Sequence, residues 1–502
     1  MSENDRPDLS RRELLAIAGG LALATAVPGC QPASAPSIGG ELADPLFFAS
    51  ATALADAIAR KRVSSEEVVR ACLDRIAAVN PKLNAVVQLD GEKALGQARE
   101  MDAALAKGNR AGPLHGVPMT IKDSLDTAGM ISTGGTLGRK SFVPGADATV
   151  VDRLKKAGAI LMGKTNTPEL TLSFETTNLI YGRTSNPYDL TRTPGGSSGG
   201  AAAIVAAGGS PFDIGSDYGG SIRQPSHFCG VAGIKPTAGR VPRTGHIYPY
   251  GSIQDSFQQI GPIARHVDDL TLLLPIIMGP DFADPGIVPM PWDDPAETRI
   301  AGLKVAYHTD NGIATPTEEI IKTVKAVADS LAGAKAVVTE ARPTGVEQAM
   351  TVGLPLYFWD GGASVRRLLQ AAGTTETSLG GFTAGTKATA VDVEAQVHAL
   401  DVWRIGMLGF FKSYDVILCP VAAVTALPHG EAGANTAFPG FSYTFSYNLT
   451  GWPGAVVRAG TTAGGLPIGV QILAHPGRED VALAVAKFVE TTHGGYRRPT
   501  ND

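Results

Sequence analysis

Segments with helical periodicity alternate with short, apolar, strand-like runs along most of this 502-residue chain. The periodicity predicts helices over 64–80, 147–158, 199–207 and 318–331, and the apolar runs predict strands over 117–121, 159–162, 211–215 and 303–307. Elements that alternate in this way pack as layers of helices and strands. The order of the segments therefore predicts an α/β fold.

Two of the expected helices carry recognisable end signals. Ser64 followed three residues later by Glu67 is a capping box, and Asn80-Pro81 ends the first helical pattern. For the second helix, Asp147 is the expected N-cap and Gly158 the expected C-cap. Both helices are expected to serve packing alone.

Composition excludes several classes of function. Lys and Arg number 43 against 48 Asp and Glu, for a formal charge of −5, and no block of like charges provides a footprint for nucleic acid. The four cysteines show no C-x-x-C spacing and no dense pattern, which argues against a zinc site or a disulfide scaffold. With 44% hydrophobic residues, the chain is predicted to be a globular protein stabilised by its core.

The first thirty residues have the pattern of an export signal. Arg11-Arg12 precedes an apolar run over 14–27, which is short for a membrane-spanning helix and typical of a twin-arginine signal peptide in a bacterial protein. Cys30 lies in a possible lipoprotein processing box, although cleavage after Ala26 or Ala35 would instead release a soluble periplasmic protein. Residues 31–46 are interpreted as a tether, so that membrane contact is expected only through a lipid on Cys30.

Two motif matches are interpreted as coincidental. Gly158 to Thr165 fits the phosphate-binding pattern G-x-x-x-x-G-K-[ST], but its variable positions form an apolar strand where a phosphate loop would need free backbone amides. Gly196 to Gly200 fits G-x-S-x-G, the nucleophile elbow of α/β-hydrolases. That motif also requires a later acid and histidine, and so many residues qualify that the test has little force.

A third set of motifs is much more specific. It joins Gly116 to Asp123 (GVPMTIKD), Pro194 to Gly200 (PGGSSGG) and Asp213 to Pro225 (DIGSDYGGSIRQP), and it continues through Phe228 to Thr237. From these residues the chain resembles the amidase signature family, over about 47–490. The resemblance implies a single large α/β domain over 47–495, with a mixed, twisted β-sheet covered by helices. A variable region over about 280–447 is expected to shape substrate binding.

The resemblance also implies the catalytic groups of an amide hydrolase that needs no metal or cofactor. The family's Ser-Ser-Lys triad carries over as Ser221, the nucleophile; Ser197, which follows a cis peptide bond and relays the proton; and Lys122, the base. A lysine exposed to water has a pKa near about 10.4 and cannot act as a base at neutral pH, so we expect Lys122 to be buried. Strand alternation is expected to turn Asp123 to the opposite face.

The segment around Ser221 is expected to supply the remaining groups. The resemblance implies an oxyanion hole formed by the backbone amides of Tyr218, Gly219, Gly220 and Ser221, and glycines allow such amides to converge. Ser198, Asp217 and Arg223 are expected to support the site, the last two as a structural ion pair. Tyr218 and His227 depart from the usual residues, Thr and a small side chain, so both are expected to reshape the pocket, and His227 raises the alternative of a Ser-His pair.

The sequence leaves the substrate and two alternative roles open. The substrate is expected to be a small-molecule or peptide amide, and aromatic residues of the variable region could form an apolar acyl pocket, namely Phe358, Trp359, Phe438, Phe441, Tyr443 and Phe445. One alternative is the ammonia-generating subunit of a tRNA-dependent amidotransferase, which the export signal disfavours. The other is a non-catalytic envelope binding protein with a decayed site, which the complete triad disfavours.

Overall fold

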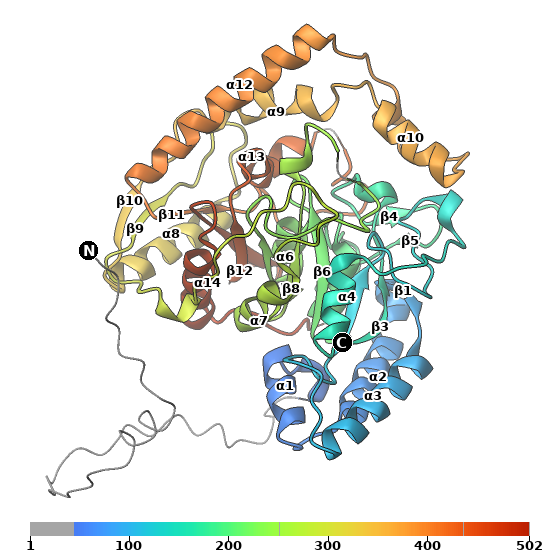
Figure 1. Ribbon diagram of the computed structural model, residues 1–502. Coiled ribbons are helices and arrows are strands. Elements are labelled where there is room, and N and C mark those ends of the chain that lie inside the picture. Colours follow the sequence, from blue (N-terminus) through green and yellow to red (C-terminus); the bar gives the residue numbers. More distant parts are fainter. Residues whose placement is uncertain (1–44, 250, 435, 501–502) are drawn as a thin grey trace, which may run out of the picture. The chain divides into compact units, whose positions relative to one another are not determined.

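The computed structural model describes residues 45–249, 251–434 and 436–500, so the predicted signal peptide, Cys30 and most of the tether lie outside the described residues. The described residues belong to one compact unit, Asp44–Asp502. Its helices are α1 (Ala51–Ala59), α2 (Ser65–Leu83), α3 (Gly91–Ala106), α4 (Thr149–Lys156), α5 (Gly199–Ala206), α6 (Arg223–Cys229), α7 (Val267–Ile277), α8 (Glu318–Gly333), α9 (Ala349–Tyr357), α10 (Ala363–Ala372), α11 (Gly380–Thr383), α12 (Ala390–Gly409), α13 (Ser442–Leu449) and α14 (Glu479–His493) (Figure 1).

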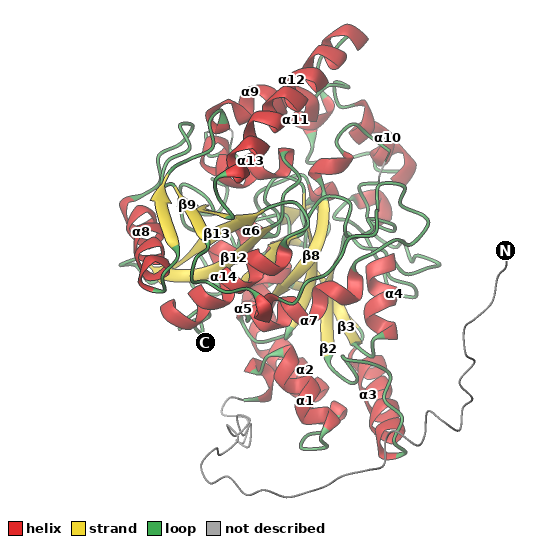
Figure 2. Cartoon of the chain, turned by 60° about the vertical axis from the view of Figure 1, so that its left-hand side comes forward, coloured by secondary structure: helices red, strands yellow, loops and turns green. Residues whose placement is uncertain are grey.

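A large mixed sheet forms the centre of this unit, as the α/β prediction requires (Figure 2). Its strands are, in spatial order, β10 (Val337–Glu340), β9 (Lys304–Tyr307), β11 (Val416–Pro420), β13 (Pro467–Ala474), β12 (Gly454–Thr461), β7 (Ala232–Lys235), β8 (Gln259–Ala264) and β6 (Phe212–Asp217). The first three strands run parallel, and the other neighbours pair antiparallel. Helices α7, α8 and α14 form one layer against the sheet, and α5 and α6 form another.

A smaller sheet extends this core at the edge where the site lies. It contains, in spatial order, β1 (Val86–Leu89), β3 (Ile160–Thr165) and β2 (Pro118–Lys122), while a separate hairpin consists of β4 (Thr177–Asn178) and β5 (Gly182–Arg183). Strand β2 lies beside β6, and every residue of both strands is buried. Lys122 at the end of β2 is therefore enclosed by protein on both sides.

Three of the predicted helix ends are wrong in detail. The Ser64 capping box is present, but α2 continues through Pro81 to Leu83 and ends where Asn84 adopts a left-handed conformation. Because Asn84 N–H still donates to Asn80 C=O (2.7 Å), the last turn keeps a closing hydrogen bond despite the proline. In α4, Ala148 occupies the N-cap and Ala157 the C-cap, because the Asp147 carboxylate instead binds Lys155 and the Ala128 amide.

The strands of the smaller sheet exclude a phosphate loop at 158–165. Gly163, Lys164 and Thr165 lie inside β3, and Lys164 Nζ donates to Thr127 and Ser132. Their backbone pairs with β1 and β2, so these amides do not converge on a ligand. This segment is structural, as its apolar strand pattern predicts.

Candidate active site

The Lys122 amine lies in a sealed pocket of hydroxyl groups. Its side chain has no exposed surface, and Nζ lies 2.7 Å from Ser197 Oγ, 2.9 Å from Ser198 Oγ and 2.9 Å from Ser216 Oγ. Burial lowers the pKa of Lys122 to about 7, although the negative charges of Asp217 and Asp213 act in the opposite direction. A substantial fraction of this amine is therefore neutral at neutral pH, as a general base requires.

Asp123 does not hold Lys122 in its charged form. The Asp123 carboxylate accepts from the Thr133 amide (3.1 Å) and the Thr133 hydroxyl, and Lys164 and Arg139 are the cations that act on it. Asp123 follows the last residue of β2 and has other partners than Lys122, as the predicted alternation requires.

The two serine segments are held side by side by hydrogen bonds. Ser198 N–H donates to Ser221 C=O (3.2 Å), and Gly196 N–H donates to Gln224 Oε1 (2.9 Å). The peptide bond between Gly196 and Ser197 is cis, as the family resemblance implies. The structure thus brings the expected relay segment against the expected nucleophile loop at the N-terminal ends of α5 and α6.

Asp217 and Arg223 form the ion pair that holds the nucleophile loop. Both side chains have no exposed surface, and Arg223 donates to both carboxylate oxygens at 2.9 Å. Burial alone would raise the pKa of Asp217, but the guanidinium of Arg223 outweighs it and keeps this pKa well below its usual range. Asn448 on α13 also donates to Asp217 (2.7 Å), so the loop is fixed from both sides of the site.

One of the four amides expected in the oxyanion hole already has an acceptor. Gly220 N–H donates to Asp217 Oδ1 (2.9 Å), whereas within the described chain the amides of Tyr218, Gly219 and Ser221 have no hydrogen-bond acceptor. Gly220 has a φ of 132°, and a Cβ there would overlap the Thr444 hydroxyl. Three backbone donors remain for a developing negative charge.

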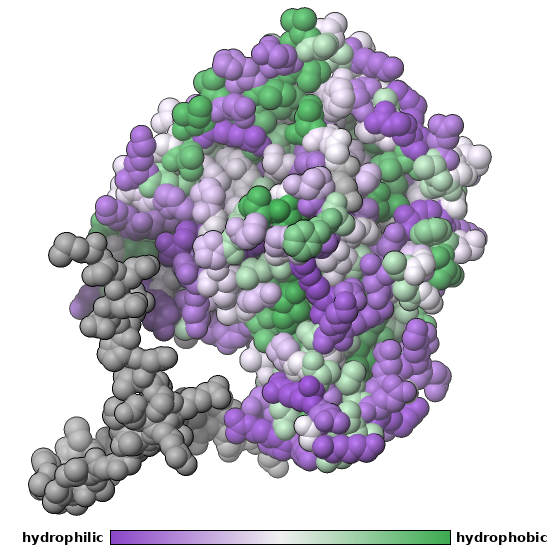
Figure 3. Space-filling view, viewed as in Figure 1, coloured by the Kyte–Doolittle hydropathy of each residue, from purple (hydrophilic) through white to green (hydrophobic). Residues whose placement is uncertain are grey.

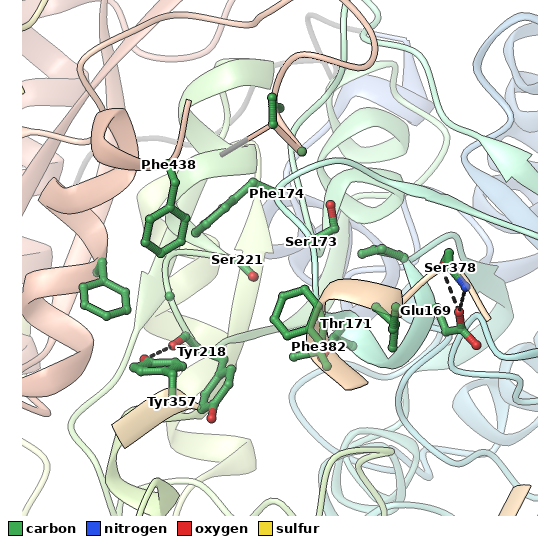
Figure 4. A pocket seen from close by; sticks show the side chains of 18 of the residues that line it. Glu169, Thr171, Ser173, Phe174, Tyr218, Ser221, Tyr357, Ser378, Phe382 and Phe438 are labelled. Atoms are coloured by element: carbon green, nitrogen blue, oxygen red, sulfur yellow. Dashed lines mark hydrogen bonds between the residues drawn. The ribbon is translucent and has the colours of Figure 1, made fainter. Parts of the chain in front are cut away.

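A largely apolar cavity of about 540 Å³ opens onto Ser221 (Figure 4). Its aromatic lining consists of Phe174, Tyr218, Tyr357, Phe358, Phe382, Phe438 and Phe445. Three of the six aromatic residues proposed for an acyl pocket, Phe358, Phe438 and Phe445, are therefore in place. Trp359, Phe441 and Tyr443 do not line this cavity.

Tyr218 shapes the floor of the cavity. Its hydroxyl donates to Gln254, and its carbonyl accepts from the Tyr357 hydroxyl at 2.5 Å, the contact drawn as a dashed line in Figure 4. Thr444 Oγ1 binds the next carbonyl, that of Gly219, at 2.9 Å. These bonds from α9 and α13 hold the backbone of Tyr218 and Gly219, which line the cavity.

His227 does not form a Ser-His pair. Its Nε2 lies 3.0 Å from Val424 C=O and its Nδ1 accepts from Gly469 N–H at 2.7 Å, while burial lowers its pKa to about 4. One ring nitrogen thus holds α6 against β13, and the other holds it against the loop that follows β11. This alternative is wrong.

Sequence reasoning missed two residues that complete the hydroxyl cluster. Ser216 binds Lys122, and His246 binds Ser216 (3.0 Å). The alternation of side chains along β6 could have indicated that the Ser216 hydroxyl lies on the side of this strand where Lys122 lies. His246 reaches the cluster through an isolated β-bridge with Leu125, a contact that no local pattern predicts.

The described residues show no metal site and no spanning helix. Within them, no group of three or more His, Cys, Asp and Glu side chains is placed to hold a metal ion. None of the helices in the described part of the chain combines the length and apolarity needed to cross a membrane.

Comparisons with known proteins identify the family of this chain. The family model described as "Amidase" matches residues 67–483. The chain is 36% identical to a glutamyl-tRNA(Gln) amidotransferase subunit of Heliobacterium modesticaldum, over 90% of this chain and 98% of that relative. It is 35% identical to an acylamidase of Rhodococcus erythropolis, over 89% of this chain and 95% of that relative.

Solved structures show the same architecture. A 6-aminohexanoate cyclic dimer hydrolase with bound substrate superposes with a TM-score of 0.81 and 28% identity, over 91% of this chain and 99% of that one. A fatty acid amide hydrolase superposes with a TM-score of 0.80 and 26% identity, over 89% of this chain and 86% of that one. The chain belongs to the amidase family and is an enzyme that hydrolyses carboxylic amides.

Proposed function

We propose that this enzyme hydrolyses its amide through an acyl-enzyme on Ser221, with Ser197 as proton relay and Lys122 as base. The observation that supports this most directly is the fully buried Lys122 amine 2.7 Å from Ser197 Oγ. A buried amine with its pKa lowered to about 7 by desolvation accepts a proton far more readily than an exposed lysine.

In the proposed steps, every transferred proton has a donor and an acceptor. Ser221 Oγ attacks the amide carbon, its proton passes to Ser197, and the Ser197 proton passes to Lys122. The oxyanion is stabilised by the amides of Tyr218, Gly219 and Ser221. Lys122 returns its proton through Ser197 to the leaving nitrogen as the C–N bond breaks, and water then cleaves the ester by the same route.

Replacing the nucleophile tests this mechanism. Ser221→Ala should lose turnover by at least about a thousandfold, because the nucleophile is removed, with nearly unchanged thermal melting, because only one small atom is lost. Ser226→Ala is the matched control, since Ser226 is a buried serine of α6 whose hydroxyl donates to Ile222 C=O. Retained turnover in purified Ser221→Ala protein would refute the assignment.

A covalent probe separates an enzyme from a binding protein with a decayed site. A fluorophosphonate should label the wild-type protein and fail to label Ser221→Ala. Absence of labelling in the wild-type protein would favour the non-catalytic alternative.

We further propose that the substrate is an uncharged amide with an apolar or aromatic group beside the scissile bond. The cavity is lined mainly by aromatic and aliphatic residues, and its buried acid, Glu169, is already bound by Ser378 N–H (2.8 Å) and by three hydroxyls, those of Thr136, Thr377 and Ser378. Charged groups would lose their hydration in this cavity without gaining a partner. A panel of anilides, amidated peptides and linear or cyclic amide oligomers tests the class, and we expect anilides or other apolar amides to give the highest kcat/KM.

The role of an amidotransferase subunit remains the second candidate because of the sequence identity to such a protein. A glutamine substrate would need polar partners for its charged groups, and the apolar lining of the cavity disfavours it. Glutaminase activity, or co-purification with other amidotransferase subunits from native cells, would favour this role.

We also propose that the protein is exported through its twin-arginine signal and is either periplasmic or anchored by a lipid on Cys30. The support is the leader sequence, with Arg11-Arg12 ahead of an apolar run. Cell fractionation tests it: a double Arg11→Lys, Arg12→Lys variant should stay in the cytosol. Cys30→Ala should release the protein from membranes if the cysteine carries a lipid.

A further inference from the structure

A buried histidine lies directly behind Lys122 in the hydroxyl cluster. His246 is 6% exposed, and its Nε2 lies 3.0 Å from Ser216 Oγ, which in turn lies 2.9 Å from Lys122 Nζ. The β-bridge between His246 and Leu125 fixes the imidazole close to the end of the strand that carries Lys122. Lys122, Ser216 and His246 therefore form a continuous chain of hydrogen bonds.

The hydrogen-bond capacity of a neutral amine constrains this chain. A neutral lysine has two N–H groups and one lone pair, and Lys122 has three hydroxyl neighbours, Ser197, Ser198 and Ser216. If Lys122 is to take the Ser197 proton, its lone pair must face Ser197. Both N–H groups then go to Ser198 and Ser216, and these two hydroxyls must send their own protons elsewhere.

Both hydroxyls have an acceptor for that purpose. Ser198 Oγ donates to Ser216 C=O at 3.3 Å. In the described part of the chain, the group that remains for the Ser216 hydroxyl is His246 Nε2. An unprotonated Nε2 places the ring proton on Nδ1, which lies 3.2 Å from Tyr248 C=O.

The other tautomer of His246 would have the opposite effect. The Tyr248 amide and the Gln258 side-chain nitrogen, each 3.1 Å from Nδ1, suit an unprotonated Nδ1 and a protonated Nε2. Nε2–H would then donate to Ser216, whose own proton could go only to the Lys122 lone pair. The amine would be turned away from Ser197 and could not act as its base.

We propose that His246 is a positioning residue: by accepting the Ser216 hydroxyl proton, it keeps the Lys122 lone pair directed at Ser197. This inference rests on the proposed role of Lys122 as base. His246 itself stays neutral, because burial, with the positive charge of Lys122, lowers its pKa to about 3. The charged groups around the chain are Asp213 and Asp217, which act on Lys122, and Arg139 and Arg243, which act on His246.

Three variants test this role in the purified enzyme. His246→Leu removes the acceptor, His246→Gln keeps one in its amide oxygen, and His227→Leu is a matched control that removes another buried histidine, which lies outside the cluster. Without an acceptor, the Ser216 proton occupies the Lys122 lone pair. His246→Leu should therefore lower kcat about tenfold with little change in KM.

The pH profile gives a second readout that loss of stability would not move. The protonated Lys122 amine donates to Ser216, whose own proton goes to His246. Without that acceptor the charged form of Lys122 is less stabilised, so the acid limb of kcat in His246→Leu should move about one unit to lower pH. His246→Gln should keep the wild-type limb and most of the activity, and His227→Leu should lower thermal stability while leaving the limb in place.

A double-mutant cycle shows whether His246 acts through Ser216. In a Ser216→Ala background, His246→Leu should cause no further loss of kcat, because the hydroxyl it directs is absent. Full additivity of the two losses, or an unchanged kcat and acid limb in His246→Leu, would overturn the proposal. If His246→Leu fails to fold, Ser216→Ala alone decides: it removes one acceptor of the protonated amine, so its acid limb must also move to lower pH, and an unmoved limb would overturn the proposal.

A failure of the positioning role can be distinguished from a failure of the proposed acyl-enzyme mechanism. If Ser221→Ala is inactive and His246→Leu is normal, the acyl-enzyme mechanism stands and the positioning role falls. If Ser221→Ala retains turnover, the mechanism itself falls.

Discussion

Two regions meet at the cavity and obey different physical constraints. Residues 114–240 supply Lys122, both serines and the Asp217–Arg223 pair, all of them buried, and the side chains of Lys122, Ser197, Asp217 and Arg223 are hydrogen-bonded within the protein. The region over 280–447 supplies aromatic side chains to the cavity, while its outer surface on α12 exposes apolar residues, Val391, Val402, Ile405 and Leu408 (Figure 3). A buried polar group without its partner is costly, whereas one apolar side chain can replace another at small cost. The residues that catalyse the reaction are therefore tightly constrained, whereas the residues that select the substrate can be exchanged at small cost.

The largest expected effect comes from the base. Lys122→Met should lower kcat/KM by about a thousandfold or more at every pH, because no other described group within reach of Ser197 is placed to accept its proton. Steady-state kinetics on purified protein measures this loss.

Lys235→Met is the matched control for that variant. Lys235 is equally buried, and burial likewise lowers its pKa to about 7, but its amine binds Gln259 (3.1 Å) and backbone carbonyls. This variant should lose thermal stability and retain turnover. Equal losses of turnover in the two variants would mean that any buried lysine supports the fold in the same way and that Lys122 has no special role.

The next effect separates a buried ion pair from an exposed one. Asp217→Asn leaves the Arg223 guanidinium without a counter-charge in a site with no exposed surface, and should cost about 3–5 kcal/mol in the free energy of unfolding. Denaturant unfolding measures it. Glu318→Gln, which breaks the exposed Lys322 pair on α8, should change stability very little. A small effect for Asp217→Asn would show that the nucleophile loop does not depend on this pair.

The sequence alone predicted most of the catalytic residues over 114–240 and little of the region over 280–447. Lys122, Ser197 and Ser221 lie in short segments whose letters resemble a family, and strand alternation correctly separated Lys122 from Asp123. The helical and strand patterns also located α5, α8, β6 and β9 within a few residues. Such signals are local, so they survive without knowledge of the tertiary structure.

These local patterns could not predict contacts between segments that lie far apart in the sequence. His246 meets Ser216 across 30 residues, and Tyr357 binds the Tyr218 carbonyl across 139. The cap of α4 was mispredicted because Lys155 and Ala128 compete for the Asp147 carboxylate. Each of these depends on which strands and helices become neighbours, which propensity and periodicity do not specify.

A moderate effect is expected in the region over 280–447, and it should depend on the substrate. Phe382→Ala removes an aromatic wall of the cavity and should lower kcat/KM for an anilide about tenfold or more, with little change for a short aliphatic amide. The ratio of the two kcat/KM values measures the effect. Phe282→Ala, at a side chain that is 98% exposed, is the control. If both substrates suffer equally, this region contributes to chemistry as well as to substrate choice.

The smallest effect is a shift of the pH profile within the catalytic region. Lys122 must be neutral to act, so activity should rise with pH through a midpoint at about 7, the pKa to which burial lowers it, and level off above that pH. The negative charge of Asp213 raises that pKa, and Asp213→Asn should therefore move the acid limb to lower pH. Because burial raises the pKa of Asp213 itself to about 7, this carboxyl is only partly charged there, and we expect the shift to stay below about one unit. A limb that stays in place or moves to higher pH would mean that Asp213 does not stabilise the charged form of Lys122.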